Sequence, residues 1–283
     1  MTLPGHTHPV RRFFDGGLPD EPADRAAPAR VFLERRMEDG SESFAVLRRL
    51  GYDDRRLGPL LVPADPATFR SDLTSVPRFF TWLVPRSGRH LPAALVHDGL
   101  VETDPAAGPT YVSTQGHVVT RPQADRVLRD AMADLGVPLV QRWLVWAAVT
   151  VATMLDGRAT GWGPLRRWWY RGAVVVTLGA VVVMGGLATA DLLDLEVGGW
   201  EVSVPWIVDA PPVPELLQGA LAAVVLPALL ASTWGPFRAA GLIAAVALGL
   251  LLPVTVALVA VYLVYLGLEG VARVIARRGQ RSE

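Results

Sequence analysis

Three long stretches without a charged residue lie in the C-terminal part of the chain and limit what it can fold into. Residues 172–190, 216–237 and 239–268 contain 19, 22 and 30 consecutive uncharged positions. A helix of about 20 apolar residues crosses the hydrocarbon core of a bilayer. We therefore expect an α-helical transmembrane region of about three helices over residues 172–270, which makes the lipid bilayer a partner. A basic C-terminal tail over residues 271–283 follows it.

The charged residues are concentrated in the rest of the chain. Residues 1–171 hold 22 of the 27 basic residues, 19 of the 27 acidic ones and all five histidines. A charged segment of this length is large enough to bury its own core, so we expect a soluble head over residues 29–168. Residues 1–28 are rich in Gly, Pro and Asp without periodicity and predict a flexible leader. Because the formal net charge is zero, nothing favours binding to nucleic acid.

Charge also indicates which side of the membrane each part occupies. The leader lacks the apolar run of a secretion signal. Arg166, Arg167 and Arg171 precede the first apolar stretch, and loop 191–215 has six acidic residues and no basic one. Positive charge favours the cytoplasmic side, so we expect a multi-pass protein with a cytoplasmic head. Three crossings place the basic C-terminal tail outside, against that tendency; an even number of crossings is the alternative.

Three residue types are missing: the sequence contains no cysteine, no lysine and no asparagine. Disulfides, thiolate metal sites and a Schiff-base lysine are therefore excluded. Lys and Asn have AT-rich codons, so their absence indicates a GC-rich bacterial genome and, with the apolar stretches, the bacterial cytoplasmic membrane.

The head reads as an α+β fold with short strands followed by helices. Short apolar runs separated by Gly and Asp over residues 30–62 predict three or four strands. Helical spacing then predicts helices from Leu91 or Pro92 to Val101, over 121–135 with Gly136 as the stop, and over 140–155.

The head also carries a His97-Asp98 dipeptide on the first predicted helix. Successive helical side chains point about 100° apart, so His97 and Asp98 reach different partners. If the next helix packs antiparallel, the Asp125 carboxylate accepts from one imidazole nitrogen and leaves the other as a base. Asp98 is a candidate ligand for a hard cation such as calcium. The alternative is a buried, purely structural His97–Asp125 pair.

Other polar residues are weaker candidates. Asp72 and Ser75 are typical of turn or N-cap positions before Pro77, and Arg78 is a candidate for binding phosphate or a lipid headgroup. His90 lies two helical turns before His97, as in some metal phosphohydrolases, but the upstream helix of such sites is missing.

Several of these residues fall in ordered motifs. The chain reads SDLTSVPR at 71–78, PAALVHD at 92–98, AD at 124–125 and GV at 136–137. Over residues 30–165 this order resembles the phage-associated domain of unknown function 1353 family, which implies an α+β fold and no established activity. The membrane tail lies outside the resemblance.

A looser similarity links the same residues to phospholipases A2. That resemblance implies that His97 is the general base for water, that Asp125 orients it and that Asp98 binds calcium. The chain departs from the pattern at Val101 and Leu128, where those enzymes carry Tyr and Phe, and it lacks their disulfides and Gly-rich calcium loop.

Two functions follow from the sequence. The first is a membrane-anchored hydrolase that acts on lipid esters, with His97 and Asp125 as catalytic residues and a phospholipid as substrate. The second is a non-enzymatic binding or assembly module at the membrane, which recognises a protein partner and in which the His-Asp pair is structural.

Overall fold

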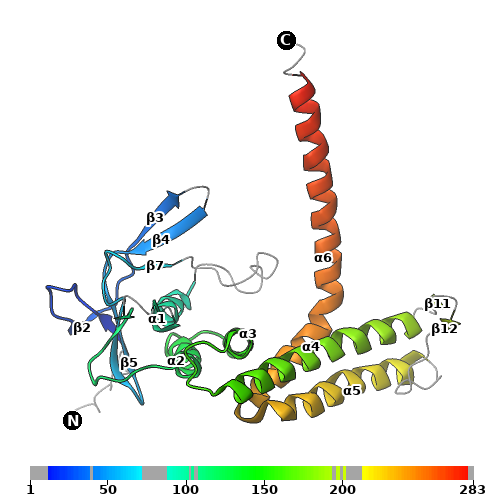
Figure 1. The fold of residues 1–283 in the computed structure, drawn as a ribbon, viewed down its shortest axis with the longest axis horizontal. Helices are drawn as coiled ribbons and strands as arrows, with labels where there is room; N and C mark the ends of the chain where they lie inside the picture. Colours follow the sequence, from blue (N-terminus) through cyan, green and yellow to red (C-terminus); the bar gives the residue numbers. More distant parts are fainter. Residues whose placement is uncertain are drawn as a thin grey trace, which may run out of the picture. The chain divides into compact units, whose positions relative to one another are not determined.

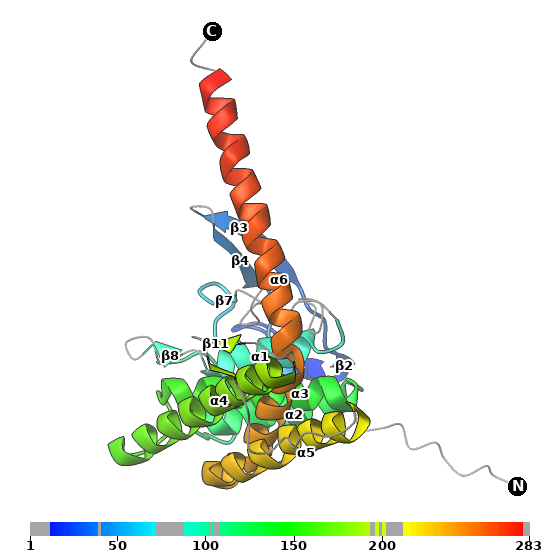
Figure 2. The same ribbon diagram turned by 90° about the vertical axis from the view of Figure 1, so that its right-hand side faces the viewer.

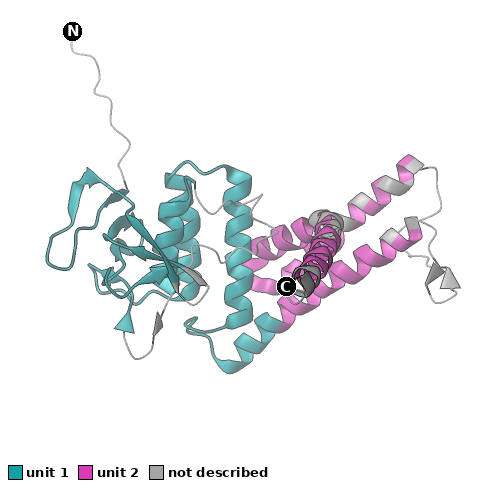
Figure 3. Cartoon of the chain, turned by 90° about the horizontal axis from the view of Figure 1, so that it is seen from above, with its two compact units in different colours: residues 1–77, 83–171 teal, residues 78–82, 172–283 magenta. Residues whose placement is uncertain are grey.

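The computed structural model describes residues 12–38, 41–71, 88–101, 103–104, 108–192, 196–197, 200–201 and 212–279. The chain divides into two units (Figure 3). Unit 1 contains residues 1–77 and 83–171, and unit 2 contains residues 78–82 and 172–283. The main division follows Arg171, where the charged sequence gives way to the first long uncharged stretch.

An antiparallel five-stranded sheet forms one layer of unit 1, in the order β10-β6-β5-β1-β2 (Figure 1). Its strands are β1 (Phe13–Asp15), β2 (Asp24–Pro28), β5 (Leu50–Asp54), β6 (Gly58–Val62) and β10 (Val112–Ser113). The β5–β6 hairpin pairs Leu50 with Val62 and Asp54 with Gly58. Gly58 has a φ of 66° at the turn, where a side chain would be strained.

Strands β1 and β2 lie within residues 1–28, where the sequence predicts a flexible leader. From Phe13 onward that prediction is wrong, because Phe13 pairs with Tyr52 of β5 and Phe14 pairs with both Gly51 and Pro28. The Phe14 side chain is buried. Pairing with strands distant in the sequence orders a segment whose own composition favours turns.

A second, three-stranded antiparallel sheet has the order β3-β4-β7. It contains β3 (Leu33–Glu38), β4 (Ser41–Val46) and β7 (Arg70–Ser71). The β3–β4 hairpin extends away from the five-stranded sheet (Figures 1 and 2). Strands β3 to β6 confirm the strands predicted over residues 30–62. Two further short strands, β8 (Thr103–Asp104) and β9 (Gly108–Pro109), pair with each other and precede β10 in the sequence.

Three helices of unit 1 lie where the sequence places them: α1 (Leu91–Val101), α2 (Arg121–Asp134) and α3 (Leu139–Asp156). Helix α2 begins after Thr120, whose amide donates to Gln123 Oε1 at 2.8 Å, as in a capping box. It ends before Gly136, whose φ is 68°. The predicted α+β order of strands followed by helices is thereby confirmed.

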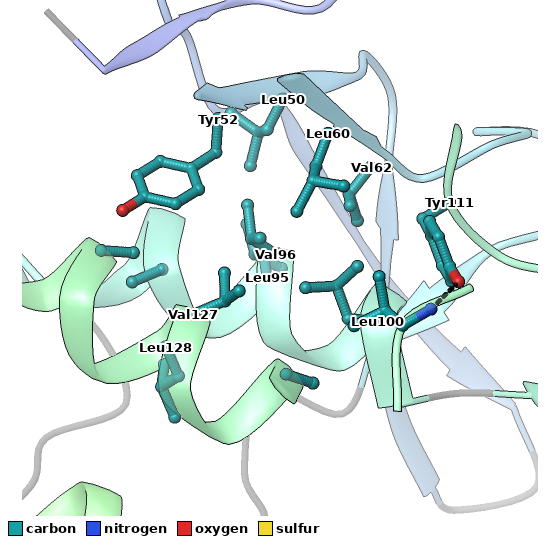
Figure 4. Packing of buried hydrophobic residues seen from close by; sticks show 14 of the residues in the cluster. Leu50, Tyr52, Leu60, Val62, Leu95, Val96, Leu100, Tyr111, Val127 and Leu128 are labelled. Carbon is teal, nitrogen blue, oxygen red and sulfur yellow. Dashed lines mark hydrogen bonds between the residues drawn. The ribbon is translucent and has the colours of Figure 1, made fainter. Parts of the chain in front are cut away.

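The core of unit 1 lies between the β5–β6 hairpin and the helix pair α1–α2 (Figure 4). Alternate residues of each strand point to the helices, as the two-residue period of a strand requires. The core side chains are Leu50, Tyr52, Leu60 and Val62 from the hairpin, Leu95, Val96 and Leu100 from α1, and Val127 and Leu128 from α2. Each is less than one-tenth exposed, and full burial of such a side chain contributes about 1.5–3 kcal/mol.

Helix α4 (Pro164–Leu192) starts in unit 1 and continues into unit 2. Its first turns are tied to α3, because Arg171 donates to the carbonyl of Leu155 at 2.6 Å and to that of Asp156 at 2.5 Å. These are carbonyls that a helix C-terminus leaves unpaired. The Arg171 guanidinium also lies 5.3 Å from the ring centre of Trp168, which is largely exposed. Arg171, the last basic residue before the first apolar stretch, therefore caps α3.

Unit 2 contains the rest of α4, then α5 (Pro212–Ala231), a 3-10 turn (Ser232–Phe237) and α6 (Arg238–Gly279). Two helical stretches, Pro164–Ala188 and Leu217–Leu250, are long and apolar enough to cross a membrane by length and composition. The second stretch runs through the 3-10 turn, where Gly235 has a φ of 58°. Helix α5 therefore ends at Ala231, before residue 237, where the sequence predicts the second apolar stretch to end. A third crossing and the membrane location stay predictions.

Trp234, in the 3-10 turn, connects the helices of unit 2. Its side chain is fully buried, and its indole Nε1 donates to Thr177 Oγ1 of α4 at 2.9 Å. On the α6 side, a Cβ added to Gly241 would lie 2.6 Å from the indole. Gly241 therefore allows α6 to approach the ring closely, whereas nothing lies within 4 Å of a Cβ added at Gly185 or Gly186 of α4.

The packing of α1 on β6 yields a first prediction. A Cβ added to Gly99 would lie 2.2 Å from Cγ1 of Val62, so Gly99→Ala forces the helix away from the hairpin. We expect it to lower the free energy of unfolding by about 1–3 kcal/mol, measured by thermal or denaturant unfolding of the full chain in detergent.

The matched control is Gly172→Ala in α4, where nothing lies within 4 Å of the added Cβ. It is expected to be neutral or to stabilise by up to about 1 kcal/mol through helix propensity. Equal stability of the two variants would contradict the close packing at Gly99.

Candidate functional site

Helices α1 and α2 bring His97 and Asp125 together. His97 Nε2 lies 2.9 Å from Asp125 Oδ1, and the two side chains are 12% and 3% exposed. An ionised carboxylate only accepts hydrogen bonds, so in the neutral imidazole Nε2 is the donor to Asp125 and Nδ1 keeps its lone pair. No hydrogen bond to Nδ1 is present among the residues that the structure describes. The contact predicted from helix geometry is present, and it leaves a basic nitrogen on an oriented imidazole.

Asp98 contacts a different element. The Ser71 hydroxyl of β7 donates to Asp98 Oδ2 at 2.6 Å, and Ser71 is buried. The two side chains of the His97-Asp98 dipeptide therefore reach a helix on one side and a strand on the other, as their 100° separation on α1 requires.

The residues described around Asp98 do not fit a calcium ion. Calcium takes 6–8 oxygen ligands, and within the described part of the chain no group of three or more His, Asp or Glu side chains lies close enough to hold a metal. Asp98 as a metal ligand therefore stays a prediction that the described geometry does not support. Within the same described residues, no such group includes His90.

Three sequence candidates, Asp72, Ser75 and Arg78, lie in residues 72–87, outside the described residues. Their roles stay predictions. Ser71, directly before them, is the residue through which β7 reaches Asp98.

A buried ion pair next to Asp125 was not predicted from the sequence. The Arg126 guanidinium donates to both carboxylate oxygens of Asp54, at 2.9 and 3.0 Å. Asp54 also accepts from the backbone amides of Arg56 and Leu57 in the β5–β6 turn. Burial raises the pKa of Asp54, but these hydrogen bonds outweigh burial and hold its pKa below the ordinary value. The pair fixes α2 against the hairpin one residue from Asp125.

A second contact between α2 and the hairpin lies two turns further along the helix. Arg55 donates to both oxygens of Asp134, at 2.6 and 2.9 Å, and the Tyr52 hydroxyl donates to Asp134 Oδ2 at 2.9 Å. Burial and this carboxylate raise the pKa of Tyr52, so the hydroxyl stays protonated. The only sequence signal for either contact is the charged run Asp53-Asp54-Arg55-Arg56 between two apolar strands.

Unit 1 is thus an α+β domain in which two helices hold a buried carboxylate against a histidine. Residues 44–149 match the family model described as "Protein of unknown function (DUF1353)". The match runs from β4 into α3 and includes His97, Asp98 and Asp125. It confirms the resemblance predicted from the motifs for this segment. No curated protein and no solved structure matches the chain, and the phospholipase A2 similarity stays a prediction.

The Asp54–Arg126 pair gives a pH-dependent prediction. Because the pKa of Asp54 is lower in the folded than in the unfolded state, its stabilising effect is present above the unfolded value of about 3.9 and is lost as pH falls through the folded value. Asp54→Asn should therefore lower stability at neutral pH, by about 3–5 kcal/mol for a broken buried pair, and weaken the loss of stability below about pH 4.

The measurement is thermal unfolding of the full chain between pH 3 and 7. Asp53→Asn is the matched control, since Asp53 pairs with the exposed Arg25 and a surface pair contributes at most about 1 kcal/mol. Similar losses of stability in Asp53→Asn and Asp54→Asn would show that the buried pair does not fix α2.

Proposed function

We propose that the protein is a membrane-anchored hydrolase that acts on lipid esters, with His97 as the general base and Asp125 as the residue that orients it. The observation that carries the proposal is the 2.9 Å contact of His97 Nε2 with Asp125 Oδ1. In the neutral imidazole this contact uses the proton on Nε2 and leaves Nδ1 as a proton acceptor, which is the state a general base requires.

The proposed reaction uses one water molecule. His97 Nδ1 takes a proton from the water as its oxygen attacks the ester carbonyl carbon. Asp125 stabilises the imidazolium that forms, as a buried carboxylate does in other His-Asp pairs. The tetrahedral intermediate then expels the alcohol oxygen, which receives the proton from Nδ1. The products are a fatty acid and a lysolipid, and His97 returns to its starting state.

The apolar helices support a lipid as the substrate. Of the two stretches that are long and apolar enough to cross a bilayer, the first begins at Pro164, at the C-terminal end of the head, and the second follows it in the sequence. A domain tethered to a bilayer meets lipid at a high effective concentration and does not need tight headgroup binding.

His97 substitution tests the proposal. We expect His97→Gln in the full chain to reduce fatty acid release from phosphatidylglycerol or phosphatidylethanolamine vesicles by about 10²–10⁴-fold, the usual contribution of a general base. His117→Gln is the matched control, because His117 is exposed on a loop of the same unit and should leave activity unchanged. A wild-type protein that releases no fatty acid from either vesicle would exclude lipid ester hydrolysis.

The burial of the pair favours a second function, a non-enzymatic binding or assembly module at the membrane. Asp125 is 2% exposed, so the pair can also serve only to lock α1 to α2. In that case His97→Gln and Asp125→Asn each lower the free energy of unfolding by about 1–3 kcal/mol in a protein without hydrolytic activity. Loss of activity at full stability would instead support the hydrolase.

We further propose that the protein is a multi-pass protein of the bacterial cytoplasmic membrane with its head in the cytoplasm. Three crossings predict that a reporter fused after the last residue and one fused before the first lie on opposite sides. Paired fusions to a phosphatase that is active only outside and to a fluorescent protein that folds only inside measure this. The same side for both ends would indicate an even number of crossings.

A further inference from the structure

Three buried polar atoms on α2 and α3 have no hydrogen-bond partner among the described residues. They are Asp125 Oδ2, Thr150 Oγ1 and Arg121 Nε. Asp125 is 2% exposed and Thr150 is 1% exposed. A buried polar atom that pairs with nothing costs about 1–3 kcal/mol, so three of them on neighbouring helices indicate a shared partner.

The register of α2 and α3 places Asp125 level with Thr150. The helices are joined by the four residues between Asp134 and Leu139. At one end, Arg121 of α2 forms an ion pair with Asp156 of α3. At the other end, the Arg129 guanidinium lies 5.2 and 5.3 Å from the ring centres of Trp143 and Trp146.

Asp125 lies one helical turn from both Arg121 and Arg129, on the same side of α2. Thr150 lies one turn after Trp146 on α3. Residues four apart share a helix face, so Asp125 and Thr150 lie on the faces of α2 and α3 that carry these two contacts, at a level between them. Burial lowers the pKa of Arg121, and the nearby Asp125 carboxylate opposes that shift, which places the third unpaired atom in the same region.

The chemistry of these atoms selects the ligand. A carboxylate oxygen accepts, a guanidinium Nε–H donates and a hydroxyl does either. A water molecule that accepts from Arg121 and donates to Asp125 and Thr150 satisfies all three, within the two to four partners that buried waters have. A metal cation is disfavoured, because the set of unpaired groups includes the positively charged Arg121 guanidinium.

We propose that α2 and α3 form a binding site for one water molecule, which links Asp125 Oδ2 to Thr150 and Arg121. Through this water, Thr150 and Arg121 are positioning residues for the His97 imidazole. Donors to Oδ2 withdraw charge from Oδ1, the oxygen that binds His97, and hold the carboxylate in one orientation. The catalytic consequence rests on the proposed function, whereas the water site itself does not.

The test uses the full chain in detergent micelles, labelled with ¹⁵N-histidine. The sequence has five histidines, and the His97 ring signals are assigned by their loss in His97→Gln. Thr150→Val replaces the hydroxyl by a methyl group of similar size. Without the hydroxyl that accepts from it, the water is no longer held, Oδ2 loses its donor and Oδ1 becomes a stronger acceptor, so we expect the proton on His97 Nε2 to shift downfield. Thr150→Ser should restore the wild-type signal.

Thr153→Val is the control, because Thr153 is equally buried on the same helix and its hydroxyl is not among the unpaired atoms. It should leave the His97 signal in place. If Thr150→Val does not fold, as shown by loss of the His117 ring signal, Thr150→Ala takes its place. An unchanged or upfield His97 signal in the folded variant, or an equal shift in Thr153→Val, would overturn the water site.

Activity separates this inference from the hydrolase proposal. In an active protein, Thr150→Val should lower kcat by up to roughly tenfold, the equivalent of one hydrogen bond, and leave KM unchanged. If no variant hydrolyses lipid but the His97 signal shifts, only the hydrolase proposal fails. If the wild type is active and the signal does not shift, only the water site fails.

Discussion

Two adjacent side chains of α2, those of Asp125 and Arg126, connect the helix to the elements on either side of it. Arg126 binds both oxygens of Asp54 in the β5–β6 turn, and Asp125 binds His97 of α1. Successive helical residues point about 100° apart, so one helix makes both contacts at the same level. Because the ion pair restrains the rotation and translation of α2 against the hairpin, it also sets where the Asp125 carboxylate meets the imidazole.

The helices of the head could be predicted because each carries its signal locally. Proline in the first turn, apolar residues at helical spacing and Gly136 after the last turn define α1 and α2 without knowledge of any partner. The His97–Asp125 contact followed from one further assumption, that the two helices pack antiparallel. The family motifs identified the same residues, and the match over residues 44–149 agrees with them.

The rest of the head could not be predicted, because it depends on contacts between distant residues. Strand β1 is specified by pairing with β5, 39 positions away at Phe13 and Tyr52, in a segment whose Gly and Pro content favours turns. Asp54 and Arg126 are 72 positions apart, and neither stands out in a sequence with many arginines and aspartates. In unit 2, helix α5 ends before the break at Gly235 and is therefore shorter than the uncharged stretch that predicts it. Hydropathy shows how long an apolar stretch is, but not where its backbone changes direction.

The partner of Asp125 sets it apart from the other aspartates that hold unit 1 together. Asp15, Asp54 and Asp134 each bind a guanidinium through both oxygens. This geometry holds a permanent positive charge against the carboxylate and satisfies the hydrogen-bonding capacity of both oxygens. Because the sequence has no lysine, arginine is the only side chain that can supply that permanent charge. Asp125 instead binds an imidazole through one oxygen.

An arginine opposite Asp125 would join α1 to α2 at least as firmly as His97 does. What an imidazole adds is a second nitrogen that can take up and release a proton near neutral pH. A structural role alone does not require that property, whereas general base catalysis does.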